Sequence, residues 1–187
     1  MFSLVALFFS FFACSLATPI ALSPPSPDHP ASLHRRIVTT AKYRAVREAA
    51  RRSGSRLLPG EWHYFRVCVL LTEPPENDIQ RETGCQHHMF LVGSVSQQSS
   101  DSAIRFEGTL YHVVWDWAIV KWEWRDYQWN IRDGQKLYYG GKTTEAKAAE
   151  GNLRRLADEW VDANVDCRDL ENNNCLGFYK WMARHMQ

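Results

Sequence analysis

The sequence predicts an α+β domain in which an antiparallel sheet packs against N-terminal and C-terminal helices. Three observations support this prediction. A helical pattern occurs near residue 40, strand patterns rich in valine and aromatic residues follow up to residue 140, and helical patterns return after residue 143. The chain has no internal repeats, and its 187 residues suffice for one ordinary domain and a processed leader.

The first half of the domain contains one predicted helix and two predicted strands. The helix covers residues 40–53, which are rich in alanine and arginine. Strands are expected over 63–71 and 87–95, because both segments are rich in valine, leucine and aromatic residues. Residues 72–84 between them contain two prolines and a glycine, which predicts a turn.

A second strand region follows a polar, serine-rich loop at 96–103. Residues 104–124 are predicted to form one or two strands interrupted by Gly108. Five of the eight tryptophans lie in this run if Trp129 just beyond it is counted, which indicates core packing on a sheet. After a turn at Asp133 and Gly134, residues 135–140 are expected to form a last strand or hairpin arm.

Two helices are predicted at the end of the chain. The first covers 143–163, and Thr143 or Thr144 is suited to cap it. Gly151 costs this helix about 1 kcal/mol relative to alanine, so a break is expected there. The final helix begins near Asn174 and has apolar residues on one face.

The N-terminal 36 residues are predicted to precede the domain. Residues 1–17 form an apolar run that ends in small residues, so we expect a signal peptide cleaved after Ala17. Residues 18–36 are rich in proline and serine and end in two arginines, which is typical of a pro-segment or a disordered linker. The domain would then cover 37–187 and be secreted.

Charge and motifs restrict the classes of function. The net charge is +1, so neither nucleic acid nor an acidic membrane surface is an expected partner. The basic cluster at 42–56 fits a solvated helix face. No apolar segment after the leader is long enough to span a membrane. The sequence contains no motif for a cofactor or a phosphate-binding loop, and no metal site is predicted.

Four cysteines remain after Cys14 is lost with the signal peptide. An even number in a secreted chain predicts two disulfides, with three possible pairings. One alternative joins Cys68 to Cys85 and Cys167 to Cys175. Another joins Cys85 to Cys167, which leaves Cys175 free and Cys68 as an inert buried thiol.

A free Cys175 has the position of a nucleophile. Asn173 or Asn174 is a suitable N-cap, so Cys175 falls in the first turn of the last helix, where the amides and the macrodipole favour a thiolate. Three histidines on the predicted strands are candidate bases. They are His87, His88 and His112.

Three motifs occur in a suggestive order within residues 85–187: HHMFLVG from His87, GTLYHV from Gly108 and NCLGF from Asn174. Together they resemble the circularly permuted papain-like group, which includes lecithin–retinol acyltransferase-like proteins and fungal relatives. The resemblance implies that His87 is the general base, that His112 orients it, and that Cys175 attacks an acyl carbon to give a thioester.

The sequence departs from the pattern of this group after Cys175, and its four remaining cysteines compete for pairing. Gly177 stands where a larger or polar residue is more usual in the group. His88 should point to the face of the strand opposite His87, so only one of the two can serve as the base.

Two hypotheses therefore remain open. The first is a secreted thiol hydrolase or acyl transferase that acts on an acyl or peptide substrate. The second is a non-catalytic fungal virulence effector, stapled by two disulfides, that binds an extracellular or host protein. They differ in the chemical state of the sulfur of Cys175.

Overall fold

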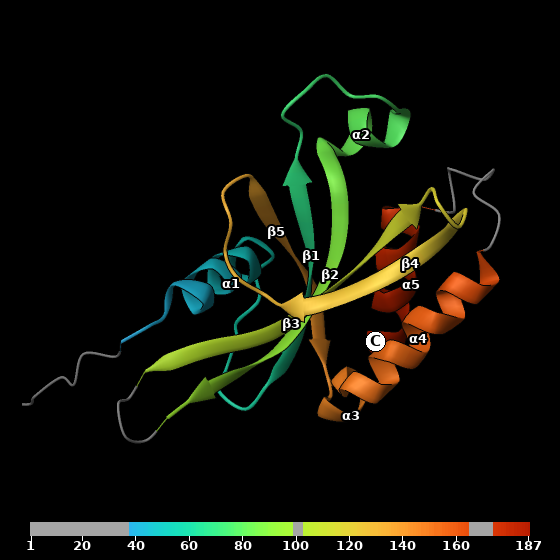
Figure 1. Ribbon diagram of the computed structural model, residues 1–187. Helices are drawn as coiled ribbons and strands as arrows, with labels where there is room; N and C mark the ends of the chain where they lie inside the picture. The colour runs from blue at the N-terminus through green and yellow to red at the C-terminus, as the bar shows by residue number, and fades with distance from the viewer. Residues whose placement is uncertain (1–37, 99–102, 165–173) are drawn as a thin grey trace, which may run out of the picture. The chain divides into compact units, whose positions relative to one another are not determined.

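A five-stranded antiparallel sheet with the strand order β4-β3-β2-β1-β5 lies at the centre of the computed structural model (Figure 1). The structure describes residues 38–98, 103–164 and 174–187. The strands are β1 (Trp62–Leu70), β2 (Cys85–Gln97), β3 (Ile104–Asp116), β4 (Lys121–Gln128) and β5 (Gln135–Thr143). The helices are α1 (Ala41–Arg52), α2 (Asp78–Thr83), α3 (Glu145–Ala148), α4 (Glu150–Ala163) and α5 (Cys175–Met186). The predicted α+β class is confirmed.

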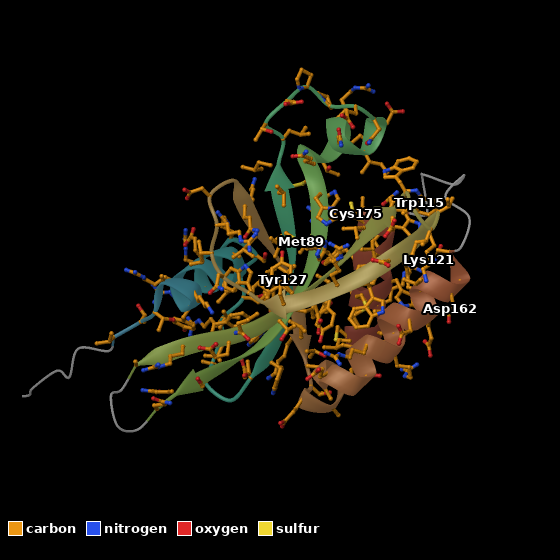
Figure 2. All side chains as sticks on the ribbon, in the orientation of Figure 1. Met89, Trp115, Lys121, Tyr127, Asp162 and Cys175 are labelled. Atoms are coloured by element: carbon orange, nitrogen blue, oxygen red, sulfur yellow. A yellow bond between two sulfur atoms is a disulfide. The ribbon has the colours of Figure 1, made fainter. Side chains whose placement is uncertain are left out.

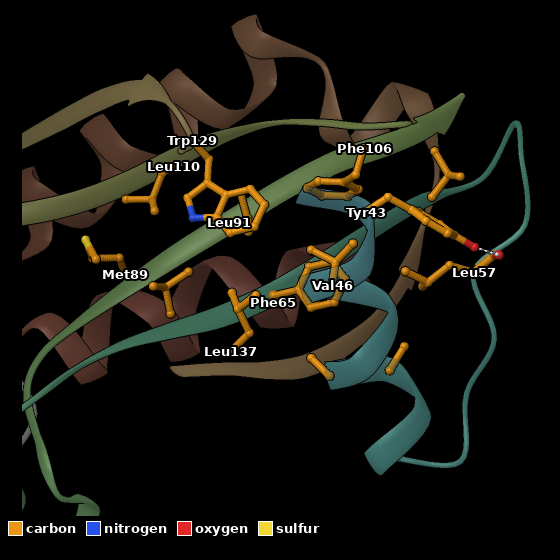
Figure 3. Packing of buried hydrophobic residues seen from close by; sticks show 14 residues of the cluster. Tyr43, Val46, Leu57, Phe65, Met89, Leu91, Phe106, Leu110, Trp129 and Leu137 are labelled. Carbon is orange, nitrogen blue, oxygen red and sulfur yellow. Dashed lines mark hydrogen bonds between the residues drawn. The ribbon is translucent and has the colours of Figure 1, made fainter. Parts of the chain in front are cut away.

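Each face of the sheet has its own hydrophobic core because side chains alternate along the strands. Phe65 of β1 packs with Val46 of α1 in one core, which Figure 3 shows from close by. Its neighbour Tyr64 lies in the other core with Phe178 of α5 and Trp160 of α4. We call these two sides of the sheet the α1 face and the α5 face.

The tryptophans divide between the two cores and the surface. On the α5 face, the ring centroid of Trp122 lies 5.4 Å from that of Trp115 and 5.7 Å from that of Trp160. Trp129 is 1% exposed on the α1 face. Trp117, in contrast, is 83% exposed at the turn between β3 and β4. Core packing thus accounts for most of these tryptophans, but not for Trp117 at the turn.

The predicted strand break at Gly108 is wrong. Strand β3 continues through Gly108, which is directly paired with Gly93 of β2. A Cβ atom added at Gly93 would lie 2.6 Å from the Cα of Gly108 and 2.8 Å from the ring of Phe106. The two glycines therefore allow adjacent strands and an aromatic ring to approach closely, and the chain turns only at residues 117–120.

The other differences from prediction concern helices. The break expected at Gly151 falls at Ala149, whose extended backbone (ψ 136°) separates α3 from α4. Thr144 caps α3, since its side chain accepts a hydrogen bond from the Lys147 N–H. The segment expected to be only a turn contains α2, which Asn77 caps and Gly84 ends in a left-handed conformation (φ 67°).

Several predictions fall outside the described residues. They concern the signal peptide at 1–17, the pro-segment or linker at 18–36, and Cys167. Among the helices that the structure does describe, none is both long and apolar enough to cross a membrane.

The close approach at Gly93 generates a stability prediction. Gly93→Ala should destabilise the fold by about 3 kcal/mol, because the added methyl group overlaps atoms of β3 that have no room to move. Gly151→Ala is the matched control, since its Cβ meets no atom within 4 Å and α4 gains up to about 1 kcal/mol of helix propensity. Urea unfolding of both variants measures the difference, and equal stabilities would contradict the packing argument.

Candidate active site

The first turn of α5 holds Cys175 against the sheet. The side chain of Asn174 caps this helix by accepting hydrogen bonds from the N–H groups of Leu176 (2.8 Å) and Gly177 (2.9 Å). Cys175 is consequently the first residue of the helix. The cap also turns the chain so that the sulfur of Cys175 faces β2, whose His88 N–H donates to it at 3.4 Å.

Cys175 is partly exposed and forms no disulfide with another described cysteine. Burial raises its pKa above the ordinary value, and this effect outweighs the hydrogen bonds from the backbone N–H groups of His88, Leu176 and Cys175, which lower the pKa. The resting group is therefore a thiol at neutral pH. The helix terminus alone predicts a thiolate, but desolvation of the charged form is the larger influence here.

A cavity of about 240 Å³ opens beside this sulfur (Figure 2 labels Cys175). Its walls are residues 77–80 at the start of α2, residues Cys85, Gln86 and His88 of β2, and residues 174–175. Sequence reasoning missed the α2 wall, because the prolines before it suggested only a turn. The pattern of Asn77 as a cap and Gly84 as a terminator was the signal that could have revealed this short helix.

His88 is the histidine that lines the cavity with Cys175. Its side chain is 1% exposed, and its Nδ1 has no hydrogen-bond partner among the described residues. Its Nε2 lies 3.3 Å from the hydroxyl oxygen of Thr83. Burial, together with the positive charges of Arg66 and Lys180, lowers the pKa of His88 to about 4. The imidazole is therefore neutral at pH 7 and able to accept a proton.

An irregularity in the pairing of β1 with β2 determines where Cys85 lies. Cys68 is paired with His88 and Val69 with His87, but Leu70 is paired with Cys85, so Gln86 is an extra residue in β2. Directly paired residues point to the same face, which brings Cys85 to the side of Cys68 and His88.

The predicted disulfide between Cys68 and Cys85 is confirmed, with a Cα–Cα distance of 5.4 Å. This bond excludes the alternative that joined Cys85 to Cys167. The predicted bridge between Cys167 and Cys175 stays a prediction, since Cys167 lies outside the described residues.

The structure brings His87 and His112 together, but on the α1 face. The Nε2 atom of His87 lies 3.0 Å from the Nδ1 atom of His112, and their rings are nearly perpendicular. His87 is next to His88 in β2, so its side chain points away from the cavity that contains Cys175. The pairing of His87 with Cys175 implied by the family resemblance is therefore not formed. His88 is the histidine on the side of Cys175, and its contact with the sulfur is made by its backbone N–H, not by a ring nitrogen.

The described residues contain no group of three or more His, Cys, Asp or Glu side chains that could hold a metal ion. The chain matches no protein-family model, and comparisons with curated proteins and with solved structures also give no match. The relationship to the permuted papain-like group consequently stays a hypothesis based on three sequence motifs.

The raised pKa of Cys175 predicts how this thiol reacts. Iodoacetamide should modify Cys175 slowly at pH 7, and the rate should rise with pH to a midpoint above 9, because only the thiolate is nucleophilic. Peptide mapping of the unreduced chain measures the rate, with the disulfide-bonded Cys68 and Cys85 as internal controls. A midpoint below pH 8 would show that the helix terminus outweighs burial, and recovery of Cys175 in a bridge with Cys167 would exclude a free nucleophile.

Proposed function

We propose that this chain is a thiol hydrolase or acyl transferase in which Cys175 is the nucleophile and His88 is the general base. One observation carries the proposal: a free thiol and a buried neutral imidazole with an unpaired nitrogen line the same cavity. An unsatisfied buried polar atom costs folding free energy, so a histidine that keeps one while lining a cavity with a cysteine is a candidate for a chemical role.

The proposed reaction begins when an acyl or peptide carbonyl enters the cavity. The sulfur of Cys175 attacks the acyl carbon while its proton passes to His88. The N–H groups of His88 and Cys175, which bond the sulfur in the resting state, are the proposed donors for the developing oxyanion. The leaving group then takes the proton from His88, and water or another acceptor cleaves the thioester.

The charges around His88 define the type of base catalysis. Arg66 and Lys180 both oppose formation of an imidazolium ion, and burial opposes both members of a thiolate–imidazolium pair. The resting state is therefore a neutral thiol beside a neutral imidazole. Proton transfer accompanies nucleophilic attack, in contrast to enzymes that keep a preformed ion pair.

We also propose that the chain acts outside the cell, as a fungal effector with an extracellular or host substrate. The Cys68–Cys85 disulfide supports an oxidising compartment, since such bonds are rare in the cytosol. The predicted signal peptide supports the same compartment from the sequence alone.

A second candidate function is binding without catalysis. The turn between β3 and β4 exposes Trp117 (83%), Ile119 (50%) and Val120 (63%) to solvent. Val120 has a left-handed backbone (φ 52°), which is unfavourable for a β-branched residue. An exposed apolar tip in a strained turn is typical of a surface that contacts a partner. This function would stand alone if Cys175 proved to be bridged.

The two candidates predict different behaviour towards a p-nitrophenyl ester. The catalytic proposal expects a burst of p-nitrophenol and an acyl adduct on Cys175, detected by intact mass. Cys175→Ser should abolish the thioester, and His88→Gln should slow acylation by about 10²–10⁴-fold. His87→Gln is the matched control on the α1 face and should acylate like the native chain. Equal loss in the two histidine variants, or no adduct in the native chain, would refute the proposal.

The pKa of His88 predicts the pH below which activity is lost, which is the acid limb of the pH profile. A general base must be neutral, so kcat/KM should rise with pH through about 4 and then stay level towards neutrality. Lys180→Gln removes an exposed positive charge and should move this limb to higher pH, because the imidazolium becomes easier to form. Circular dichroism at each pH separates this titration from unfolding. A limb at the ordinary histidine pKa of about 6.5 would contradict the role of the buried His88.

A further inference from the structure

The histidine pair on the α1 face has no part in the proposed reaction. His87 belongs to β2 and His112 to the adjacent strand β3, and both side chains are partly exposed. Their Nε2 and Nδ1 atoms are 3.0 Å apart. This contact is a hydrogen bond in which one neutral ring donates and the other accepts, so two nitrogen atoms from different strands converge on one point.

This geometry is close to that of a metal chelate. Zinc–nitrogen bonds are about 2.0–2.1 Å long, so two nitrogens on a tetrahedral zinc ion are separated by about 3.3 Å. The two nitrogens of the pair need to move apart by only a few tenths of an ångström. Rotation about the broad χ2 torsions of the two rings supplies this movement and turns both lone pairs towards a common ion.

We propose that His87 and His112 form an open two-imidazole site for a divalent transition-metal ion such as Zn²⁺, with water at the remaining positions. The site is open because no third His, Cys, Asp or Glu joins the pair among the described residues. Imidazole is a preferred ligand of zinc, copper and nickel. The ring that donates in the hydrogen bond moves its proton to its other nitrogen on binding, so no net proton is released.

One positive charge near the pair opposes the binding of a cation. Arg125 is paired with His112 across β3 and β4, and its charge repels a cation. Its side chain is 60% exposed and lies 3.6 Å from Glu123, which moderates the repulsion.

Neighbouring side chains contact the ring of His112 and restrict its position. The ring of Tyr127 lies edge-on to that of His112, with 5.7 Å between the centroids. The hydroxyl of Tyr127 donates to the Sδ atom of Met89 at 3.5 Å. Both residues belong to the core on the α1 face, and Figure 2 labels them. Such packing keeps the imidazole of His112 in place, and this preorganisation reduces the entropy lost on metal binding.

Zinc titration of the full chain tests this site. Calorimetry at pH 7 should show binding that weakens at least tenfold in His87→Gln and in His112→Gln, because each leaves one imidazole. His185→Gln is the matched control, since His185 is an exposed histidine on α5 whose Nδ1 lies 2.9 Å from the carbonyl oxygen of Trp181. Arg125→Gln should tighten binding, because it removes the repelling charge.

Two further measurements show whether zinc binds at the histidine pair rather than elsewhere. In the native chain, ¹⁵N imidazole shifts of His87 and His112 should move together on zinc addition, which requires no variant to fold. Cys175→Ser should bind zinc like the native chain, so the result is independent of the thiol site. Binding that survives both histidine substitutions, or that is lost in Cys175→Ser, would overturn the proposal.

Discussion

The register between β1 and β2 is the constraint on which the arrangement of reactive groups depends. The extra residue Gln86 brings Cys85 to the α5 face beside Cys68, and the disulfide between these cysteines then links the two strands. Because Cys68 is paired with His88 and Val69 with His87, His88 faces the cavity and His87 faces the opposite side. A slip of one residue would exchange the faces of these two histidines and remove His88 from the cavity that contains Cys175.

At Cys175, two physical effects act in opposite directions. The N–H groups at the start of α5 stabilise a thiolate, whereas burial against the sheet stabilises the thiol, and burial is the stronger. The same burial keeps His88 neutral. A cysteine at a helix N-terminus is therefore not activated by its position alone, and in the proposed mechanism His88 in the same cavity is the base that activates it.

The sheet separates two chemistries that the sequence places next to each other. His87 and His88 are consecutive, yet one belongs to an imidazole pair with His112 on the α1 face and the other to the thiol cavity on the α5 face. Alternation of side chains along β2 produces this separation without any insertion or extra domain. Each face has its own core, so changes to the residues of one site leave the packing of the other face intact.

The sequence alone determined the elements whose signals are local. Helical periodicity gave α1 and the C-terminal helices, valine-rich runs gave the strands, and Asn174 marked the start of α5. The local signal for α2 lay in Asn77 and Gly84, whereas local patterns did not determine the continuity of β3 through Gly108 or the histidine that lines the cavity with Cys175. Those features depend on a glycine facing a glycine, on an extra residue in a strand and on helix packing, which arise only when distant segments come together. Periodicity shows that two neighbouring strand residues face opposite ways, but only the tertiary structure decides which face carries the helix.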